Sequence, residues 1–323
     1  MVKKMNIKKI KKFQIVLSVF ILISLIGSII FRLSFRKVFN DYYFEDQWYL
    51  KNINYMNSLK FIDKNEMQKV KVALIDGPVD MDSNDLTKSD ITVKYIPRNL
   101  VNKKFDTGHA THLCSIMIAN SNNKEGITGL IHGAKVFSYV ITDGKNSAKS
   151  NDVIDAINAA INDKVDVINL SFGSYRYSKQ EEDLINKALN NNIVVVASYG
   201  NHGEKRGMYP AVYAGVISVG AVDKDNDLTI FSNYGESLSV VAPGYEIMGV
   251  TGKMKYEKIS GTSQATAIVS SLAAAIKSKD RSLSPIEVKS IIENSCKKID
   301  KGSNQQYYGH GLIDYEKALK SIT

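Results

Sequence analysis

Short β-branched runs alternate with helix-length segments from residue 70 onward, and this alternation constrains the fold more than any other feature. The expected strands are residues 70–75, 135–141, 165–170, 193–197, 216–222 and 238–241. Helical patterns cover 109–119, 152–163 and 181–190, an Ala- and Ser-rich helix covers 263–277, and Ser284 and Pro285 begin another. Apolar strands that alternate with helices are typical of βαβ units in a buried, mostly parallel sheet. We therefore expect one α/β domain with its site at the carboxyl ends of the strands.

The N-terminal segment differs from this body. Residues 15–31 form an uncharged, mostly apolar run, which reaches roughly the lower length limit for a transmembrane helix. Six lysines precede the run and three basic residues follow it, so the positive-inside bias places the N-terminus in the cytoplasm. We expect a cytoplasmic basic segment and transmembrane anchor in residues 1–37. Residues 38–323 would then form an extracytoplasmic domain of a single-pass protein of the cell membrane. A cleaved signal peptide, which would release a secreted protein, is the alternative.

Charge and cysteine content exclude several classes of protein. The formal net charge is +9, but nine of the 42 Lys and Arg residues lie within residues 1–37, and the remaining 33 equal the 33 Asp and Glu residues. A body without excess positive charge argues against a nucleic-acid partner. Two cysteines, Cys114 and Cys296, are too few for a disulfide framework or a structural zinc site. Both lie in apolar helical stretches, where buried free thiols are expected.

Asp76 is the first candidate functional residue. It ends the apolar strand VKVALID, and Gly77 and Pro78 turn the chain away immediately afterwards. A carboxylate at the carboxyl end of a strand is well placed to orient another group. Taken alone, the same pattern also suits a turn former or a helix cap.

His109 and His112 lie three residues apart at the expected start of a helix. That spacing places both rings on one helix face, where they are able to share a metal ion. The segment has no HExxH pattern and no nearby pair of cysteines. A single functional histidine is therefore favoured over a metal site.

Ser263 and Asn201 complete the set of candidates. Ser263 lies at the start of a helix of small residues, where the positive helix end favours a nucleophile and an oxyanion, although a simple N-cap fits equally well. Asn201 follows a buried strand in VVVASYGN, where its amide is able to donate to a developing oxyanion or to form an ordinary turn.

The order of these residues, Asp then His then Ser, is that of subtilisin. The chain resembles the subtilisin-like serine proteases, the subtilase family, over nearly its whole body, from about Gln47 to Gly311. The blocks that carry the resemblance are VALIDGPVD with Asp76, GHATH with His109, INLSFG with residues 171–173, YGN with Asn201, and GTSQAT with Ser263.

The resemblance implies a three-layer α/β fold and a role for each candidate. His109 would take the proton of Ser263, Asp76 would hold the imidazole, and Asn201 would join the Ser263 backbone amide in an oxyanion hole. His112 would be structural. The implied substrate-binding segments are Ser171, Phe172 and Gly173, which would pair with an extended substrate, and Ser198, Tyr199 and Gly200, which would line the other side of the specificity pocket.

Several positions depart from the family pattern. Cys114 and Ser115 have larger side chains than the residues usual in the family, in the helix that carries His109. Ala267 replaces a proline after the nucleophile. Met208 stands where small residues often floor the specificity pocket, so we expect a shallow pocket. Asp85 and Asn122 match the family's calcium-binding positions, and their oxygen atoms suit calcium, although the loop near Lys124 is one residue longer.

The leading hypothesis is a membrane-anchored serine endopeptidase that cleaves peptide bonds through an acyl-enzyme and processes a secreted peptide or protein. Lantibiotic leader peptidases are a candidate subgroup. No cofactor is expected for the chemistry itself. Two non-enzyme alternatives remain at this point: an inactive, protease-like module that binds peptides, and a transport or scaffold component held by the anchor.

Overall fold

The computed structural model describes residues 39–322, apart from 98–99, 101–104, 146 and 300–304. It divides the chain into two units, residues 1–40 and 41–323, and the second unit is described below. The transmembrane helix expected within residues 1–37 lies outside the described residues. In the part of the chain that is described, no helix has the length and apolar character needed to cross a membrane.

A seven-stranded sheet forms the centre of the domain, with strand order β2-β3-β1-β4-β5-β6-β7 and every neighbouring pair parallel. The six strands expected from the sequence are all present, with ends within two residues of those expected. The predicted α/β class and parallel sheet are thereby confirmed. The strands are β1 (Lys71–Asp76), β2 (Asp90–Tyr95), β3 (Lys135–Val140), β4 (Val167–Leu170), β5 (Val194–Ser198), β6 (Ile217–Val222) and β7 (Val240–Pro243).

Three strands were not expected from the sequence. β2 forms one edge of the sheet, and its residues are half-buried or exposed, so it lacks the continuous apolar run of the inner strands. The other two, β8 (Ile247–Gly252) and β9 (Lys255–Ile259), pair in an antiparallel hairpin outside the main sheet. The hairpin packs through β8 against helix α5.

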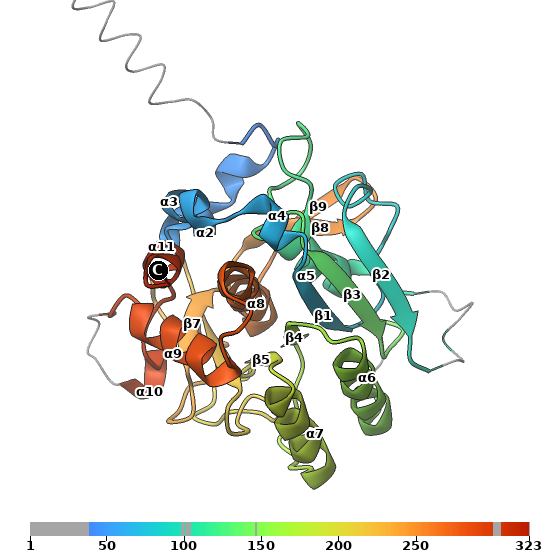
Figure 1. The fold of residues 1–323 in the computed structure, drawn as a ribbon, viewed down its shortest axis with the longest axis vertical. Coiled ribbons are helices and arrows are strands. Elements are labelled where there is room, and N and C mark those ends of the chain that lie inside the picture. The colour runs from blue at the N-terminus through green and yellow to red at the C-terminus, as the bar shows by residue number, and fades with distance from the viewer. Residues whose placement is uncertain (1–38, 98–99, 101–104, 146, 300–304, 323) are drawn as a thin grey trace, which may run out of the picture. The chain divides into compact units, whose positions relative to one another are not determined.

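Helices cover both faces of the sheet, which gives the three layers (Figure 1). On one face, α8 crosses strands β1, β4, β5, β6 and β7 and also packs against α5, while α6 and α7 cover the other face. The long helices are α5 (Gly108–Ile118), α6 (Ser150–Asn162), α7 (Lys179–Asn190), α8 (Thr262–Lys279) and α9 (Pro285–Ser295). The short ones are α2 (Trp48–Asn52), α3 (Tyr55–Ser58), α4 (Lys64–Met67), α10 (Gln305–Tyr308) and α11 (Tyr315–Lys320), with 3-10 turns at Phe44–Asp46 and Leu59–Phe61.

Small side chains explain the central position of α8. Every residue from Thr262 to Ser278 is buried, and Ala and Ser dominate the sequence, so the helix axis is able to lie close to the strands. The next helix, α9, begins as expected: Ser284 forms a capping box with Glu287, and Pro285 occupies the first turn. Cys114 and Cys296 are buried free thiols, as expected.

The topology brings the candidate residues to one edge of the sheet. β1, β4 and β5 are neighbours and parallel, so the segments that follow Asp76, Leu170 and Ser198 leave the sheet at the same edge. Two further candidates lie in the first turns of helices on one face, His109 in α5 and Ser263 in α8. Helices α5 and α8 contact each other, and both contact β1, which ends at Asp76.

Candidate active site

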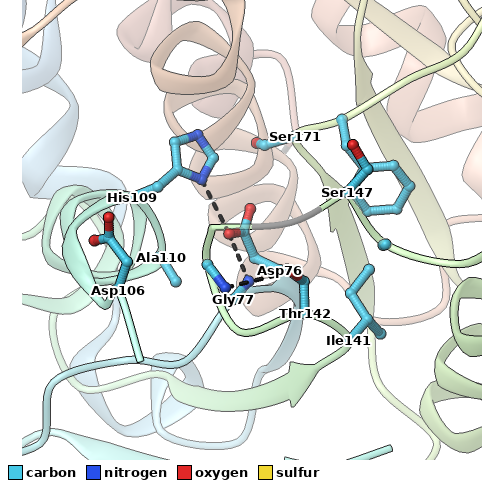
Figure 2. Close-up of a pocket in the computed structure, with 12 residues that line it drawn as sticks. Asp76, Gly77, Asp106, His109, Ala110, Ile141, Thr142, Ser147 and Ser171 are labelled. Carbon is cyan, nitrogen blue, oxygen red and sulfur yellow. Dashed lines mark hydrogen bonds and ion pairs between the residues drawn. The ribbon is translucent and has the colours of Figure 1, made fainter. Parts of the chain in front are cut away.

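Asp76 and His109 form a direct pair. Nδ1 of His109 lies 2.9 Å from Oδ1 of Asp76, and the same oxygen accepts a hydrogen bond from the backbone N–H of Gly77 at 2.7 Å (Figure 2). Asp76 is 8% exposed, whereas the imidazole is partly open to solvent. A carboxylate beside Nδ1 holds the proton on that nitrogen and leaves Nε2 as the proton acceptor.

Electrostatics favour the protonated form of His109. The negative charge of Asp76 raises the pKa of the imidazole above its ordinary value, burial opposes this shift, and the hydrogen bond to Asp76 and the charge of Asp106 add to it. Figure 2 shows Asp106 on one side of His109 and Ser171 on the other. The imidazole is therefore a base whose proton affinity is set by two carboxylates.

Ser263 contacts the segment that follows β4. Its Oγ donates to the carbonyl oxygen of Ser171 at 3.1 Å, and Oγ of Ser171 donates to the carbonyl oxygen of Ser263 at 3.2 Å. The hydroxyl proton of Ser263 is thus directed at Ser171 and not at His109. Hydrogen bonds between a nucleophile and its base are often long or misaligned until substrate binds. Ser263 lies in the first turn of α8, where the backbone N–H groups have no partners within the helix.

Asn201 is fixed by the residue before Ser263. Its Oδ1 accepts from both the backbone N–H and the Oγ1 of Thr262, each at 2.8 Å, which sets the orientation of the amide. A Cβ atom built on Gly261 would lie 3.5 Å from Nδ2 of Asn201 and 3.7 Å from the backbone N of Ser263. The same position lies 2.7 Å from Oε1 of Gln264, so the Asn201 amide and the Ser263 backbone N–H lie near each other beside Gly261 and the Gln264 side chain.

Ser171 is held in place from below by the central helix. Nδ2 of Asn169 donates to Oγ of Ser171 at 3.0 Å, and Oγ of Ser270 donates to Oδ1 of Asn169 at 2.9 Å. The following residues, Phe172 and Gly173, are half-buried and exposed, respectively, so the segment has an accessible edge. A cavity of about 190 Å³ opens beside it. The cavity is lined by Asp76, Gly77, Asp106, His109, Ala110, Ile141, Thr142, Gly144, Ser147, Ala148, Ser171 and Phe172.

The second expected substrate-binding segment, residues 198–200 at the end of β5, contributes mainly backbone atoms to the site. Ser198 is buried, and the Tyr199 ring lies in the core with its hydroxyl 2.7 Å from Oγ of Ser237. The Tyr199 side chain therefore points away from the nucleophile. Gly200 has a φ of 124°, a conformation that only glycine adopts readily, and it leads directly to Asn201.

His112 is part of the framework beneath the site. It is fully buried, and its Nε2 lies 3.0 Å from the carbonyl oxygen of Ile247 and 3.3 Å from that of Glu257, in the β8–β9 hairpin. Burial lowers the pKa of this imidazole to about 4, so the ring is neutral near pH 7. His112 thus joins α5 to the hairpin.

The calcium expectation concerns Asp85 and the loop that contains Asn122. Both oxygens of Asp85 accept hydrogen bonds, Oδ1 from Nδ2 of Asn123 and Oδ2 from the backbone N–H of Ile127, each at 2.8 Å. Burial raises the pKa of Asp85 to about 6, and the charge of Asp41 adds to the increase. Among the described residues, no group of three or more His, Cys, Asp and Glu side chains is arranged to hold a metal ion.

Asp41 was missed by the sequence analysis. Its carboxylate is fully buried, Oδ1 accepts from the backbone N–H of Asn123 at 3.1 Å, and Oδ2 has no hydrogen-bond partner. A buried carboxylate oxygen without a partner is costly unless a cation compensates it. With Asp85 nearby, the oxygen chemistry fits calcium, although both oxygens of Asp85 already accept N–H groups. No local sequence signal marks Asp41, because it meets the loop only through the fold.

Comparison with known proteins places the chain in a family. Residues 67–311 match the Subtilase family, Peptidase_S8. The chain is 33% identical over 285 residues to a thermophilic serine proteinase of Bacillus sp. (strain AK1), across 87% of this chain and 69% of that protein. It is also 33% identical to subtilisin E of Bacillus subtilis (strain 168), across 78% of this chain and 66% of that protein.

Solved structures agree with this assignment. A protease from Pseudoalteromonas arctica PAMC 21717 shares the fold with a TM-score of 0.80 at 24% identity, over 89% of this chain and all of that one. The prenylagaramide maturation protease PagA has a TM-score of 0.71 at 25% identity, over 84% of this chain and 97% of that one. The chain belongs to the subtilase family of serine endopeptidases.

Proposed function

We propose that Asp76, His109 and Ser263 form the catalytic triad of this endopeptidase, and that Asn201 and the backbone N–H of Ser263 form its oxyanion hole. One observation carries the proposal: the Asp76 carboxylate holds Nδ1 of His109 at 2.9 Å, at the sheet edge where α8 presents Ser263. The hydrogen bonds of Asn201 to Thr262, the residue before Ser263, support the proposal.

The reaction follows from these positions. His109 takes the hydroxyl proton through Nε2 as Oγ of Ser263 attacks the carbonyl carbon of the scissile bond. The carbonyl oxygen gains negative charge and accepts hydrogen bonds from Nδ2 of Asn201 and the backbone N–H of Ser263. His109 then gives the proton to the leaving amine, and water hydrolyses the acyl-enzyme by the same steps in reverse order. Asp76 stabilises the imidazolium during both acylation and deacylation.

Substrate binding uses the exposed edge of residues 171–173. An extended peptide is able to add to this edge through main-chain hydrogen bonds, a mode that depends little on sequence. Residues 198–200 flank the other side of the reacting group through their backbone. The substrate is therefore a peptide or an unfolded segment of a protein.

Calcium has a structural place in this proposal. Asp41 and Asp85 would hold the ion next to the loop that contains Asn122, where the ion would neutralise the charge of these carboxylates. The chain's own residues carry the chemistry.

The N-terminal sequence and one structural relative support the proposed cellular role. The uncharged run at 15–31 with its basic flanks supports a membrane anchor and an extracytoplasmic catalytic domain. Likeness to a maturation protease supports processing of a dedicated peptide substrate. A reporter fused after Thr323 tests the orientation, because a cytoplasmic reporter would contradict it.

Labelling of the full-length chain with a fluorophosphonate probe tests the catalytic proposal. The wild-type protein and the Ser282→Ala and His310→Ala controls should be labelled, whereas Ser263→Ala and His109→Ala should not. A circular dichroism spectrum like that of the wild type would show that the variants fold. Absence of labelling in a folded, calcium-supplied wild-type sample would contradict the triad and favour a peptide-binding module.

A further inference from the structure

The side chain of Met208 lies between the two segments that flank Ser263. A Cβ atom built on Gly173 would lie 2.9 Å from Cβ and 3.6 Å from Cε of Met208. A Cβ atom built on Gly200 would lie 2.9 Å from Sδ of the same residue. The thioether therefore spans the space between the end of the 171–173 segment and the end of the 198–200 segment.

The backbone around Met208 is fixed from both sides. The N–H of Met208 donates to the carbonyl oxygen of Tyr199 at 3.2 Å, next to Gly200. Its neighbour Tyr209 exchanges two backbone hydrogen bonds with Ser174, at 2.8 and 2.9 Å, next to Gly173. Withdrawal of the Met208 backbone from the gap would break contacts with both segments, so the side chain is confined there to changes of rotamer.

The proposed function places the side chain of the substrate residue before the scissile bond in the same gap. Segments 171–173 and 198–200 are the two that the proposal assigns to the two sides of the substrate. The carbonyl oxygen of Ser171, in the first segment, accepts from Oγ of Ser263, and Asn201 directly follows the second segment. Under this proposal the side chain next to the attacked carbonyl carbon enters between the segments, toward Met208.

We infer that Met208 limits this position of the substrate to small side chains, those of Gly, Ala and Ser. The inference rests on the proposed function and deepens it, since it names the class of bond that is cleaved. A larger side chain has to displace a thioether that is in van der Waals contact with two glycines. Both Gly173 and Gly200 lack the Cβ that would collide with Met208, so the three residues fit one another.

Peptide substrates that differ only in the residue before the scissile bond test the inference on the full-length chain. The wild-type enzyme should cleave after Ala with a kcat/KM at least about tenfold above that after Phe or Leu. Met208→Gly should raise kcat/KM for Phe and Leu at least about tenfold and change that for Ala much less. Met208→Ser provides a second opened variant in case the glycine variant does not fold. Met254→Ala, which changes an exposed methionine of the hairpin tip, is the matched control.

Equal kcat/KM for cleavage after Ala and after Phe by the wild type would overturn the inference. An unchanged ratio of these two kcat/KM values in both Met208→Gly and Met208→Ser would overturn it as well. Fluorophosphonate labelling of the same samples separates this failure from that of the proposed function. A labelled enzyme with no preference for small residues would refute only the role of Met208. An unlabelled, folded enzyme that cleaves none of the peptides would refute the triad and this inference together.

Discussion

The hydroxyl groups of Ser171 and Ser263 each donate a hydrogen bond to the backbone carbonyl oxygen of the other residue, at 3.2 and 3.1 Å. This reciprocal pair joins the end of β4 to the first turn of α8. The nucleophile is thereby positioned by the sheet as well as by its own helix. Because the acceptor for Oγ of Ser263 is a backbone atom, the orientation of the nucleophile does not depend on the identity of side chain 171.

Replacement of these two serines should separate stability from catalysis. Ser171→Ala removes the bonds of its hydroxyl to Ser263 and Asn169, and loss of a buried hydrogen bond costs about 1 kcal/mol in the free energy of unfolding. We expect a lower melting temperature and a kcat within about tenfold of wild type, because the Ser171 carbonyl remains. Ser263→Ala should fold and show no hydrolysis above background. A Ser171→Ala enzyme as inactive as Ser263→Ala would show that the side chain takes part in the reaction.

Asn201→Asp is a sharp test of the oxyanion hole. A carboxylate preserves an acceptor for the two donors of Thr262 but replaces the Nδ2 donor with an oxygen. We expect kcat to fall by about 10²–10³ with a smaller change in KM, since the lost interaction forms in the transition state. Thr262→Val is the control, because it removes only the Oγ1 donor to Asn201 and should retain kcat within about tenfold. An Asn201→Asp enzyme with wild-type kcat would exclude the amide from the reaction.

The charge of Asp106 should set part of the pH profile. His109 accepts a proton only when neutral, so kcat/KM falls as the pH drops through the pKa of its imidazole. Asp76 and Asp106 both raise that pKa. Asp106→Asn removes one negative charge, lowers the pKa and should move the acid limb of the kcat/KM profile to lower pH. Asp183→Asn, on the exposed face of α7, should leave the limb in place. An acid limb that stays fixed or moves to higher pH in Asp106→Asn would contradict the assignment.

The parts of the fold that the sequence predicts are those set by local patterns. The six predicted strands read as mostly apolar runs because most of their residues are buried. Asp76, His109 and Ser263 each lie at an element boundary that nearby glycines mark. β2 was not predicted, since its polar residues Asp90, Thr92 and Lys94 alternate with Ile91, Val93 and Tyr95 and leave no continuous apolar run.

The unpredicted parts depend on contacts between distant segments. Ser171 and Ser263 are 92 residues apart, so the local sequence around one residue does not reveal its hydrogen bonds with the other. The inward turn of the Tyr199 ring depends on Ser237, which a resemblance of the YGN block does not reveal. The contact of Met208 with both Gly173 and Gly200 likewise requires the backbone bridges that tertiary structure creates. The resemblance placed Met208 at the floor of the specificity pocket, but it did not reveal these two contacts.

Calcium should raise the melting temperature of the protein through Asp41 and Asp85. Both carboxylates are fully buried, and Oδ2 of Asp41 has no hydrogen-bond partner, so a divalent cation would relieve an unfavourable burial of negative charge. A ligand at about one hundred times its Kd stabilises the folded state by about 2.7 kcal/mol. In a domain of this size we expect a rise of at least about 3 °C over a chelator-treated sample. Asp41→Asn should reduce this rise, whereas Asp183→Asn should not. Equal melting temperatures of the wild type with calcium and with chelator would show that the Asp41 and Asp85 carboxylates are stabilised by N–H groups without a bound ion.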